Sequence, residues 1–277
     1  MENFIKVCKK LHSNEEKCNS ERMDLSEISK SGVKTRIIAS MAVFSALYTV
    51  LRLIPTVPMI GVSGSFSLSD ILAPLYGVIL GPYVGGFSVI LGTFLAIGLG
   101  RPVTFMLLDF LPATINAVAL GLLIKRKWMP VVVLYTVLLA AFLLNPLSRF
   151  LVQVPLGNSA FSFPFAWMHI VAFVVLLSPL GRKAAQWVET LKTANVAKGL
   201  AIMAFIGTMM QHLMGNLLFE GVLGQILGSI PAGAYPGIWA TVFFVYPWER
   251  LALIVFAVVI GTPLVRVIKK SFLPFKA

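Results

Sequence analysis

Charged residues and cysteines are scarce in this chain of 277 residues. Asp, Glu, Lys and Arg make up only 12% of it, whereas 58% of the residues are hydrophobic. Soluble domains usually carry about a quarter charged residues, so the composition argues against a soluble globular protein. The two cysteines, Cys8 and Cys18, lie close to the N-terminus at a spacing that matches no zinc motif. We interpret them as reduced cytoplasmic thiols without a structural role.

Several catalytic signatures are also missing. The sequence has no P-loop, no HExxH, no GxSxG and no pair of intramembrane aspartates. ATP hydrolysis by the P-loop route is therefore excluded, and a membrane protease is disfavoured. We expect no enzymatic activity, no cofactor and no metal site. The net charge of +12 is compatible with nucleic acid, but no basic stripe interleaved with aromatic residues occurs outside the apolar segments. We therefore expect no nucleic-acid partner.

Long apolar segments dominate the rest of the chain. A helix needs about 20 apolar residues to cross the hydrocarbon core, and backbone groups in the bilayer must pair within the segment. The sequence therefore predicts an all-α, polytopic integral membrane helix bundle with about eight (six to eight) transmembrane helices. The apolar segments lie near residues 37–54, 66–80, 83–100, 103–124, 129–150, 163–181, 198–224 and 238–265.

Basic residues gather in alternate gaps between these segments. They lie at 34–36, 125–127, 182–198 and 266–270. Together with those of the N-terminal tail and Lys276, 19 of the 23 basic residues fall on one side of the membrane if every segment spans it. Lys and Arg resist translocation, so that side is the cytoplasm. We predict a multi-pass protein of the cell membrane with both termini cytoplasmic. Its parts are a polar tail, a transmembrane domain and a short C-terminal tail, at 1–33, 34–270 and 271–277.

The apolar segments differ in the residues that interrupt or end helices, chiefly Gly and Pro. Gly81 and Pro82 join the second and third segments, which predicts a tight turn on the inner side, and Pro74 favours a broken or re-entrant second helix. Residues 55–65, 152–162 and 225–237 are predicted to be outer loops, since they are rich in Gly, Pro and Ser or separate two segments.

Polar side chains inside the segments indicate a site. An ionisable group in the bilayer is costly and usually functional. Thr208, His212, Asn216 and Glu220 recur every four residues and form one stripe on a helix. The predicted topology places polar residues of four helices in the outer half of the membrane, which predicts a cavity open to the outside. The candidate substrate-binding residues are Asp109, Asn116, Asn145, Arg149, His212, Asn216, Glu220, Trp239, Tyr246, Trp248, Glu249 and Arg250.

Structural roles for these residues stay open at this point. Arg149 and Glu249 would also fit structural ion pairs, and Trp239 would fit an interfacial aromatic belt. His212 alone would fit a hydrogen bond between packed helices. If the cavity exists, its aromatic residues would stack on a ring, its arginines would pair with a carboxylate or phosphate, and its acidic residues with a cation.

Several motifs together resemble those of a known family, the substrate-binding S components of energy-coupling factor transporters. Ala42 and Ala46 match the AxxxA pair of the family's first helix. The following segments are similar to the family in their aromatic and acidic start, in a Gly-Pro turn and in a glycine-rich helix, and the last segment is similar around Tyr246 to Arg250. The resemblance covers 36–124 and 198–268 best, and it departs in span count, because the family usually has six helices.

The resemblance implies a role and partners. An S component binds a vitamin or similar micronutrient at the outer face and docks on a transmembrane coupling subunit with two ATPase subunits. Ala42 and Ala46 would be the docking residues. Two other classes remain open. One is a self-contained secondary transporter that uses Asp109 or Glu220 as a proton carrier, and the other is a membrane enzyme acting on a lipid-linked substrate.

Overall fold

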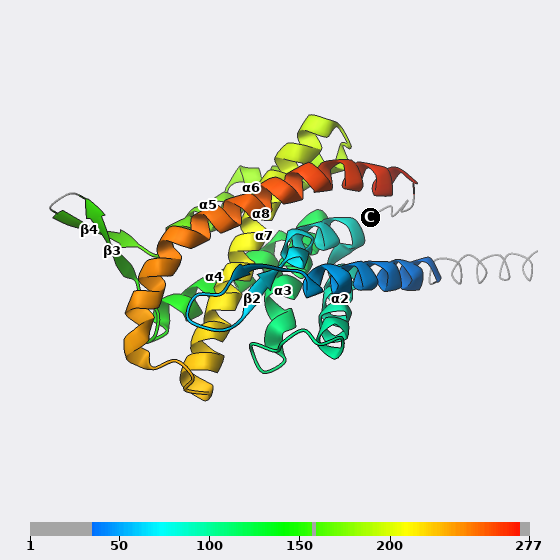
Figure 1. The fold of residues 1–277 in the computed structure, drawn as a ribbon. Coiled ribbons are helices and arrows are strands. Elements are labelled where there is room, and N and C mark those ends of the chain that lie inside the picture. The colour runs from blue at the N-terminus through cyan, green and yellow to red at the C-terminus, as the bar shows by residue number, and fades with distance from the viewer. Residues whose placement is uncertain (1–34, 157–158, 272–277) are drawn as a thin grey trace, which may run out of the picture. The chain divides into compact units, whose positions relative to one another are not determined.

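The computed structural model describes residues 35–156 and 159–271, so the tails predicted at 1–33 and 271–277 lie outside the described residues, apart from Ser271. The described residues are mostly helical, at 77%, and this confirms the helical class (Figure 1). It divides into two units, one up to Val43 and one from Phe44 onward. The first helix, Thr35–Leu53, begins in one unit and ends in the other.

The elements after the first helix alternate between long helices and short extended pieces. In chain order they are β1 Pro55–Pro58, β2 Ser65–Ser67, η1 Leu68–Ile71, α2 Ala73–Gly98, η2 Leu108–Phe110, α3 Leu111–Ile124, α4 Trp128–Leu144, β3 Leu151–Leu156, β4 Ser159–Pro164, α5 Trp167–Leu177, α6 Pro179–Glu189, α7 Thr193–Leu218, η3 Phe219–Ile226, η4 Ala232–Ala234 and α8 Tyr235–Ser271.

Four helices in the described part are long and apolar enough to cross a membrane. They are Thr35–Leu53, Ala73–Gly98, Thr193–Ile226 and Ala232–Lys270. A fifth would arise if α5 and α6, which are bent by 70° at their junction, formed one span. The helices α3 and α4 are apolar but shorter, with 14 and 17 residues. The prediction of about eight spans is therefore not supported, although a membrane protein is.

Proline explains why two of the apolar segments do not become full spans. α4 ends at Leu144 because Asn145 is extended before Pro146, and α5 ends where Ser178 is extended before Pro179. A residue that precedes proline is driven out of the helical region in this way. The apolar segments at 129–150 and 163–181 are thereby cut into shorter pieces.

The turn predicted at Gly81 and Pro82 is present inside α2. Gly81 has φ +79°, a conformation open to glycine, and its backbone is not helical. A Cβ atom at Gly85 would lie 2.6 Å from the carbonyl oxygen of Tyr76, nine residues earlier. Residues nine apart in a straight helix are about 13 Å apart along its axis. The chain therefore bends sharply at Gly81, so that α2, one candidate span by length and composition, consists of two helical segments that pack on each other.

Two antiparallel hairpins occupy places predicted to be loops. β1 pairs with β2 through Pro55 with Ser67 and Pro58 with Ser65. β3 pairs with β4 over six residues from each strand, and this hairpin projects away from the helices in Figure 1. The prediction of loops rested on breaker residues, which are usually depleted in strands, and it therefore missed these short strands.

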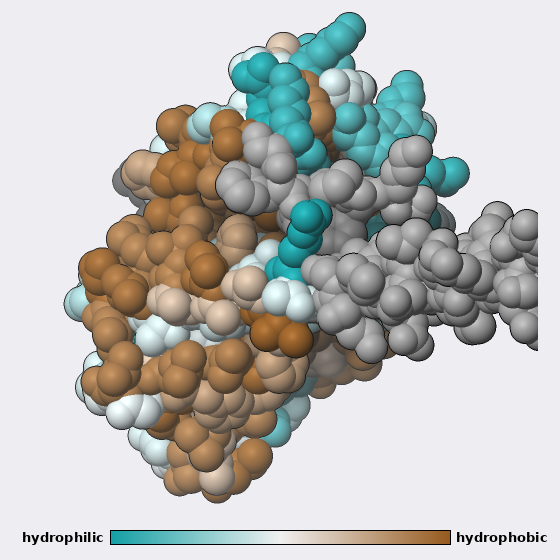
Figure 2. Space-filling view, turned by 90° about the vertical axis from the view of Figure 1, so that its right-hand side faces the viewer, coloured by the Kyte–Doolittle hydropathy of each residue, from teal (hydrophilic) through white to brown (hydrophobic). Residues whose placement is uncertain are grey.

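Helix α7 lies at the centre of the second unit. It packs against α3, α4, α5, α6 and α8, and 72% of its most apolar stretch is buried. The corresponding stretch of α8 is only 22% buried. Exposed residues of α8 include Val255, Phe256 and Val259, which is the surface expected of a lipid-facing helix. Figure 2 shows broad hydrophobic surface on one face of the molecule, with hydrophilic residues gathered towards one edge.

Candidate functional site: a polar and aromatic cavity

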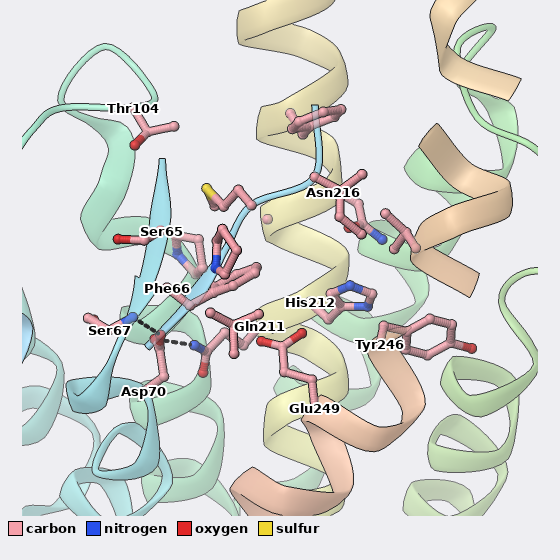
Figure 3. Close-up of a pocket in the computed structure, with 18 of the residues that line it drawn as sticks. Ser65, Phe66, Ser67, Asp70, Thr104, Gln211, His212, Asn216, Tyr246 and Glu249 are labelled. Carbon is pink, nitrogen blue, oxygen red and sulfur yellow. Dashed lines mark hydrogen bonds between the residues drawn. The ribbon is translucent and has the colours of Figure 1, made fainter. Parts of the chain in front are cut away.

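A cavity of about 130 Å³ lies in the second unit. Its walls come from the β1–β2 hairpin, from the loop between α2 and α3, from α7 with the start of η3, and from α8. The residues that line it combine three arginines and three carboxylates with several aromatic rings. Figure 3 shows that the labelled side chains come from elements that are far apart in the sequence.

Arg101 holds the hairpin that covers the cavity. Its Nη2 donates hydrogen bonds to the carbonyl oxygen of Ser65 at 2.6 Å and to the Ser65 hydroxyl at 3.0 Å, with a longer bond to the Phe66 carbonyl at 3.4 Å. Burial lowers the pKa of the Arg101 guanidinium, and the positive charge of Arg52 lowers it further. The Arg101 guanidinium thus already donates its hydrogen bonds to the β1–β2 hairpin.

Asp109 stabilises the loop opposite this hairpin. Its two carboxylate oxygens accept hydrogen bonds from the backbone N–H groups of Thr104 at 3.0 Å and Phe105 at 3.1 Å. Arg52 donates from Nη2 to the Asp109 carbonyl oxygen at 3.3 Å. A carboxylate that accepts two backbone N–H bonds is held in one orientation. Asp109 lines the cavity, and each of its two carboxylate oxygens already has one partner within the protein.

A chain of buried hydrogen bonds forms the floor. Asp70 accepts from the backbone N–H of Ser67 at 3.2 Å and from Nε2 of Gln211 at 2.8 Å, the two bonds drawn in Figure 3. Gln211 in turn accepts from Nδ2 of Asn116 at 2.8 Å. These three buried side chains join η1, α3 and α7. Since each member would be costly to bury alone, the chain holds the three elements in register.

Glu249 and Arg250 form an ion pair at the wall made by α8. Nη2 of Arg250 lies 2.9 Å from Oε1 of Glu249, and the two side chains are 2% and 13% exposed respectively. The Arg250 guanidinium also lies 5.5 Å from the centre of the Phe66 ring, a cation–π distance. In Figure 3 the Glu249 carboxylate points from α8 toward Gln211 and His212 of α7.

Stacked rings line the side nearest α5. His212 and Tyr246 stack with centroids 4.9 Å apart, and His169 of α5 stacks on His212 at 5.1 Å. Nε2 of His169 lies 2.9 Å from Nδ1 of His212, so one nitrogen donates and the other accepts. Trp239 packs edge-on against Phe219 and donates from Nε1 to the Leu147 carbonyl oxygen at 2.8 Å. These bonds hold the aromatic rings in place.

Three buried donors of lining residues have no hydrogen-bond partner among the described residues. They are Nε of Arg52, Nδ2 of Asn216 and Nε of Arg250. Burying a donor without a partner costs about 1–3 kcal/mol, so a ligand acceptor in this space would be favoured.

The structure brings seven of the twelve predicted site residues together. Those that line the cavity are Asp109, His212, Asn216, Trp239, Tyr246, Glu249 and Arg250. Those that do not line it are Asn116, Asn145, Arg149, Glu220 and Trp248. Asn116 supports the floor through Gln211, as described above.

The remaining four lie elsewhere. Glu220 is fully buried and accepts from the Ser148 hydroxyl at 2.6 Å. Asn145 accepts from the Leu147 N–H and from Gln225. Arg149 is exposed and bonds the Leu151 carbonyl oxygen, and Trp248 is 73% exposed. The twelve polar and aromatic residues that were predicted to lie in the outer half of the membrane therefore do not all line one cavity.

Sequence reasoning missed several residues of the site. Gln211, Ser65, Arg52 and Arg101 received no role in the predicted site, and neither did His169, which stacks on the lining residue His212. A signal existed for Gln211, because it is a polar residue next to His212 in an apolar segment. No local signal marks His169, which meets His212 only through the packing of α5 on α7. No group of three or more metal-ligating side chains occurs among the described residues.

Comparison with known proteins yields one distant relative. The chain is similar to an uncharacterized protein of Methanocaldococcus jannaschii, with 25% identity over 178 residues. The match covers 64% of this chain, which spans about half (54%) of that protein's length. No family model matches the chain. No solved structure matches it either.

Proposed function

We propose that this protein is a membrane-embedded substrate-binding subunit that captures a small, vitamin-like molecule from outside the cell. The cavity between the β1–β2 hairpin, α7 and α8 carries this proposal. It combines paired charges, buried unpartnered donors and fixed aromatic rings in one cavity, as small-molecule sites do. A protein with only packing roles would fill such a space with apolar side chains, because empty space and unmatched polar groups both cost stability.

The resemblance to S components supplies the proposed partners. The subunit would dock on a transmembrane coupling subunit with two ATPase subunits. Ala42 and Ala46 are both exposed on the first helix, as a docking surface for another helix requires. Small residues allow two helix backbones to approach closely in lipid. Replacing both alanines with Phe should abolish co-purification with the ATPase subunits while leaving ligand binding intact.

Its topology is proposed from the basic residues. Both termini would lie in the cytoplasm, and the loop at 225–237 would face outward. In a background without Cys8 and Cys18, Gly233→Cys should react with an impermeant thiol reagent added to whole cells. Lys127→Cys should react only after the membrane is opened. The reverse pattern would contradict the proposed direction of capture.

Mass spectrometry of small molecules retained by the purified protein tests the main proposal. We expect one small organic compound at close to stoichiometric amount, and its loss from an Asn216→Leu variant that still elutes as a folded protein. Retention of an unaltered amount by this variant, or of lipid alone, would contradict substrate capture in the cavity.

A secondary transporter is a second candidate because of Glu220. One oxygen of this fully buried carboxyl accepts from Ser148, and the other has no partner among the described residues. An ionisable group in such a place fits a proton carrier. The protein reconstituted alone in vesicles would then take up its ligand when a proton gradient is imposed, and Glu220→Gln would abolish this uptake. Uptake that needs ATPase subunits would exclude this candidate.

A further inference from the structure

The charges of the cavity are already balanced within the protein. Three guanidinium groups, of Arg52, Arg101 and Arg250, line it together with three carboxylates, of Asp70, Asp109 and Glu249. Each of the six is bonded to a protein group: the carboxylates accept from N–H donors, and the guanidinium groups donate to carbonyl or carboxylate oxygens. The formal charges of the six groups sum to zero, so the cavity as a whole favours neither an anion nor a cation. Only Arg250 and Glu249 neutralise each other as an ion pair, and the other four are bonded to neutral groups.

The ion pair of Glu249 and Arg250 disfavours a charged ligand group at this particular place in the cavity. The two groups are 2.9 Å apart, so a ligand group that reaches one lies beside the other. A carboxylate would be attracted by Arg250 but repelled by Glu249, and an amidinium would meet the opposite conflict. A group with a donor and an acceptor side by side satisfies both without a net charge.

The free hydrogen-bonding positions have the same pattern. Nε of Arg250 and Nδ2 of Asn216 are buried donors without partners among the described residues, and they require an acceptor. Glu249 is bonded only through Oε1 to its neighbour in the hydrogen bonds of the described part, so Oε2 offers an acceptor to a ligand donor. A primary amide or a lactam carries both complementary atoms on one carbon.

We propose that the cavity binds an uncharged aromatic compound that carries an amide or lactam group, with this group at Glu249 and Arg250 and the ring among Phe66, Tyr246 and Trp239. This inference rests on the proposed function and names the substrate class of the same site. One buried water molecule occupies about 10–15 Å³ of cavity volume. A cavity of about 130 Å³ therefore holds roughly ten atoms of the size of a water oxygen, which is roughly ten non-hydrogen atoms of a ligand. That is the size of one ring with one polar substituent.

A matched set of probes tests the charge requirement directly. Benzamide, benzoate and benzamidinium have the same ring and nearly the same shape, and they are neutral, anionic and cationic. Binding to the full-length protein in detergent, freed of retained compounds, is measured by ligand-detected NMR. We expect benzamide to bind at least about tenfold more tightly than either ion, because each ion leaves one like charge beside it.

Variants of the pair should move this preference in opposite directions. Glu249→Gln leaves Arg250 without its carboxylate, so benzoate should become the preferred probe. Arg250→Gln should favour benzamidinium for the converse reason. The double variant has no charge at the pair and should prefer benzamide again, and it should fold even if one single variant does not, since removing both partners leaves no uncompensated charge.

The exposed ion pair of Arg126 and Glu189 provides the control. Arg126→Gln and Glu189→Gln remove the same charges far from the lining of the cavity and should leave all three affinities unchanged. Tighter binding of an ion, or of the zwitterion phenylglycine, to the unaltered protein would overturn the amide assignment but leave substrate capture standing. Binding of none of the probes, together with the absence of any retained compound, would overturn both.

Discussion

Helix α8 separates two hollows of opposite character. One side supplies Tyr246, Glu249 and Arg250 to the polar cavity, and the other contributes to an open groove with a volume of about 620 Å³. The groove is apolar throughout and is completed by α5 and the β3–β4 hairpin. Its lining residues are Val154, Phe161, Phe163, Trp167, Met168, Phe243, Phe244, Pro247, Trp248 and Leu251.

This comparison teaches that neighbours in the sequence have different environments on one helix. Tyr246 is buried at the cavity, whereas Trp248, two residues later, is 73% exposed at the groove. Two residues along an α-helix differ by about 200° around its axis, so they face nearly opposite sides. The aromatic residues in 239–250 therefore identify a ligand site only when it is known on which side of α8 each ring lies. The following variants compare the two sides.

The largest difference is expected at the charged pair. Arg250→Ala would leave Glu249 as a buried carboxylate without its counter-charge, which typically costs about 3–5 kcal/mol. Leu251→Ala on the other side should cost far less, because Leu251 is 49% exposed. Equilibrium unfolding in mixed detergent would measure both. Equal losses at 250 and 251 would mean that the cavity side of α8 is not a low-dielectric environment.

Two tryptophans test the packing of each side. Trp239 is 2% exposed and contacts the rings of Phe142, Phe165 and Phe219, so Trp239→Ala should cost about 3–5 kcal/mol of unfolding free energy. Trp248→Ala should stay within about 0.5 kcal/mol. A large loss at Trp248 in the detergent-purified protein would show that the groove is filled and closed rather than open.

The buried polar floor should give an intermediate effect. Gln211→Leu removes the donor to Asp70 and the acceptor for Asn116 while keeping a similar volume, which should cost about 1–3 kcal/mol. Gln225→Leu is the control, since its side chain is exposed and makes one bond to Asn145 at 3.2 Å. Thermal unfolding compares them, and an equal effect of both variants would show that the floor does not stabilise the fold.

The smallest effect is expected from single hydroxyl groups. Tyr246→Phe removes the hydrogen bond to the Phe165 carbonyl oxygen at 2.9 Å, a net change of about 0.5–1.5 kcal/mol. The ring stack with His212 is retained. Benzamide binding should therefore change less than stability does. A large loss of binding would instead place this hydroxyl group in contact with the ligand.

Local patterns explain which parts of the fold were predictable. The turn at Gly81 and Pro82 follows from residues that act within one turn of the chain. Pro74, which was expected to break the second helix, instead lies in the first turn of α2, a position that accepts proline. The count of eight spans is not supported by the described residues, because apolar composition does not report where a helix stops. Asn145 and Ser178 become extended ahead of a proline, and this divides segments that read as continuous.

The candidate site was predictable only where one helix carries the information. The four-residue spacing of His212 and Asn216 placed both on the same face of α7, and both line the cavity. Glu220 shares that spacing but lies in η3, a π-helical stretch that follows α7. The wider turn changes the direction of its side chain, and Glu220 meets Ser148 instead of the cavity.

Membrane character and helix content follow from the sequence by itself, because apolar length and breaker residues act on each segment independently of the others. Tertiary structure alone decided the cavity. Asp70 meets Gln211 across 141 residues, and Arg101 meets Ser65 across 36. Such pairs form only when the bend at Gly81 and the packing of α3, α7 and α8 bring separate elements together. No pattern within a single segment encodes which of its polar residues will find a partner.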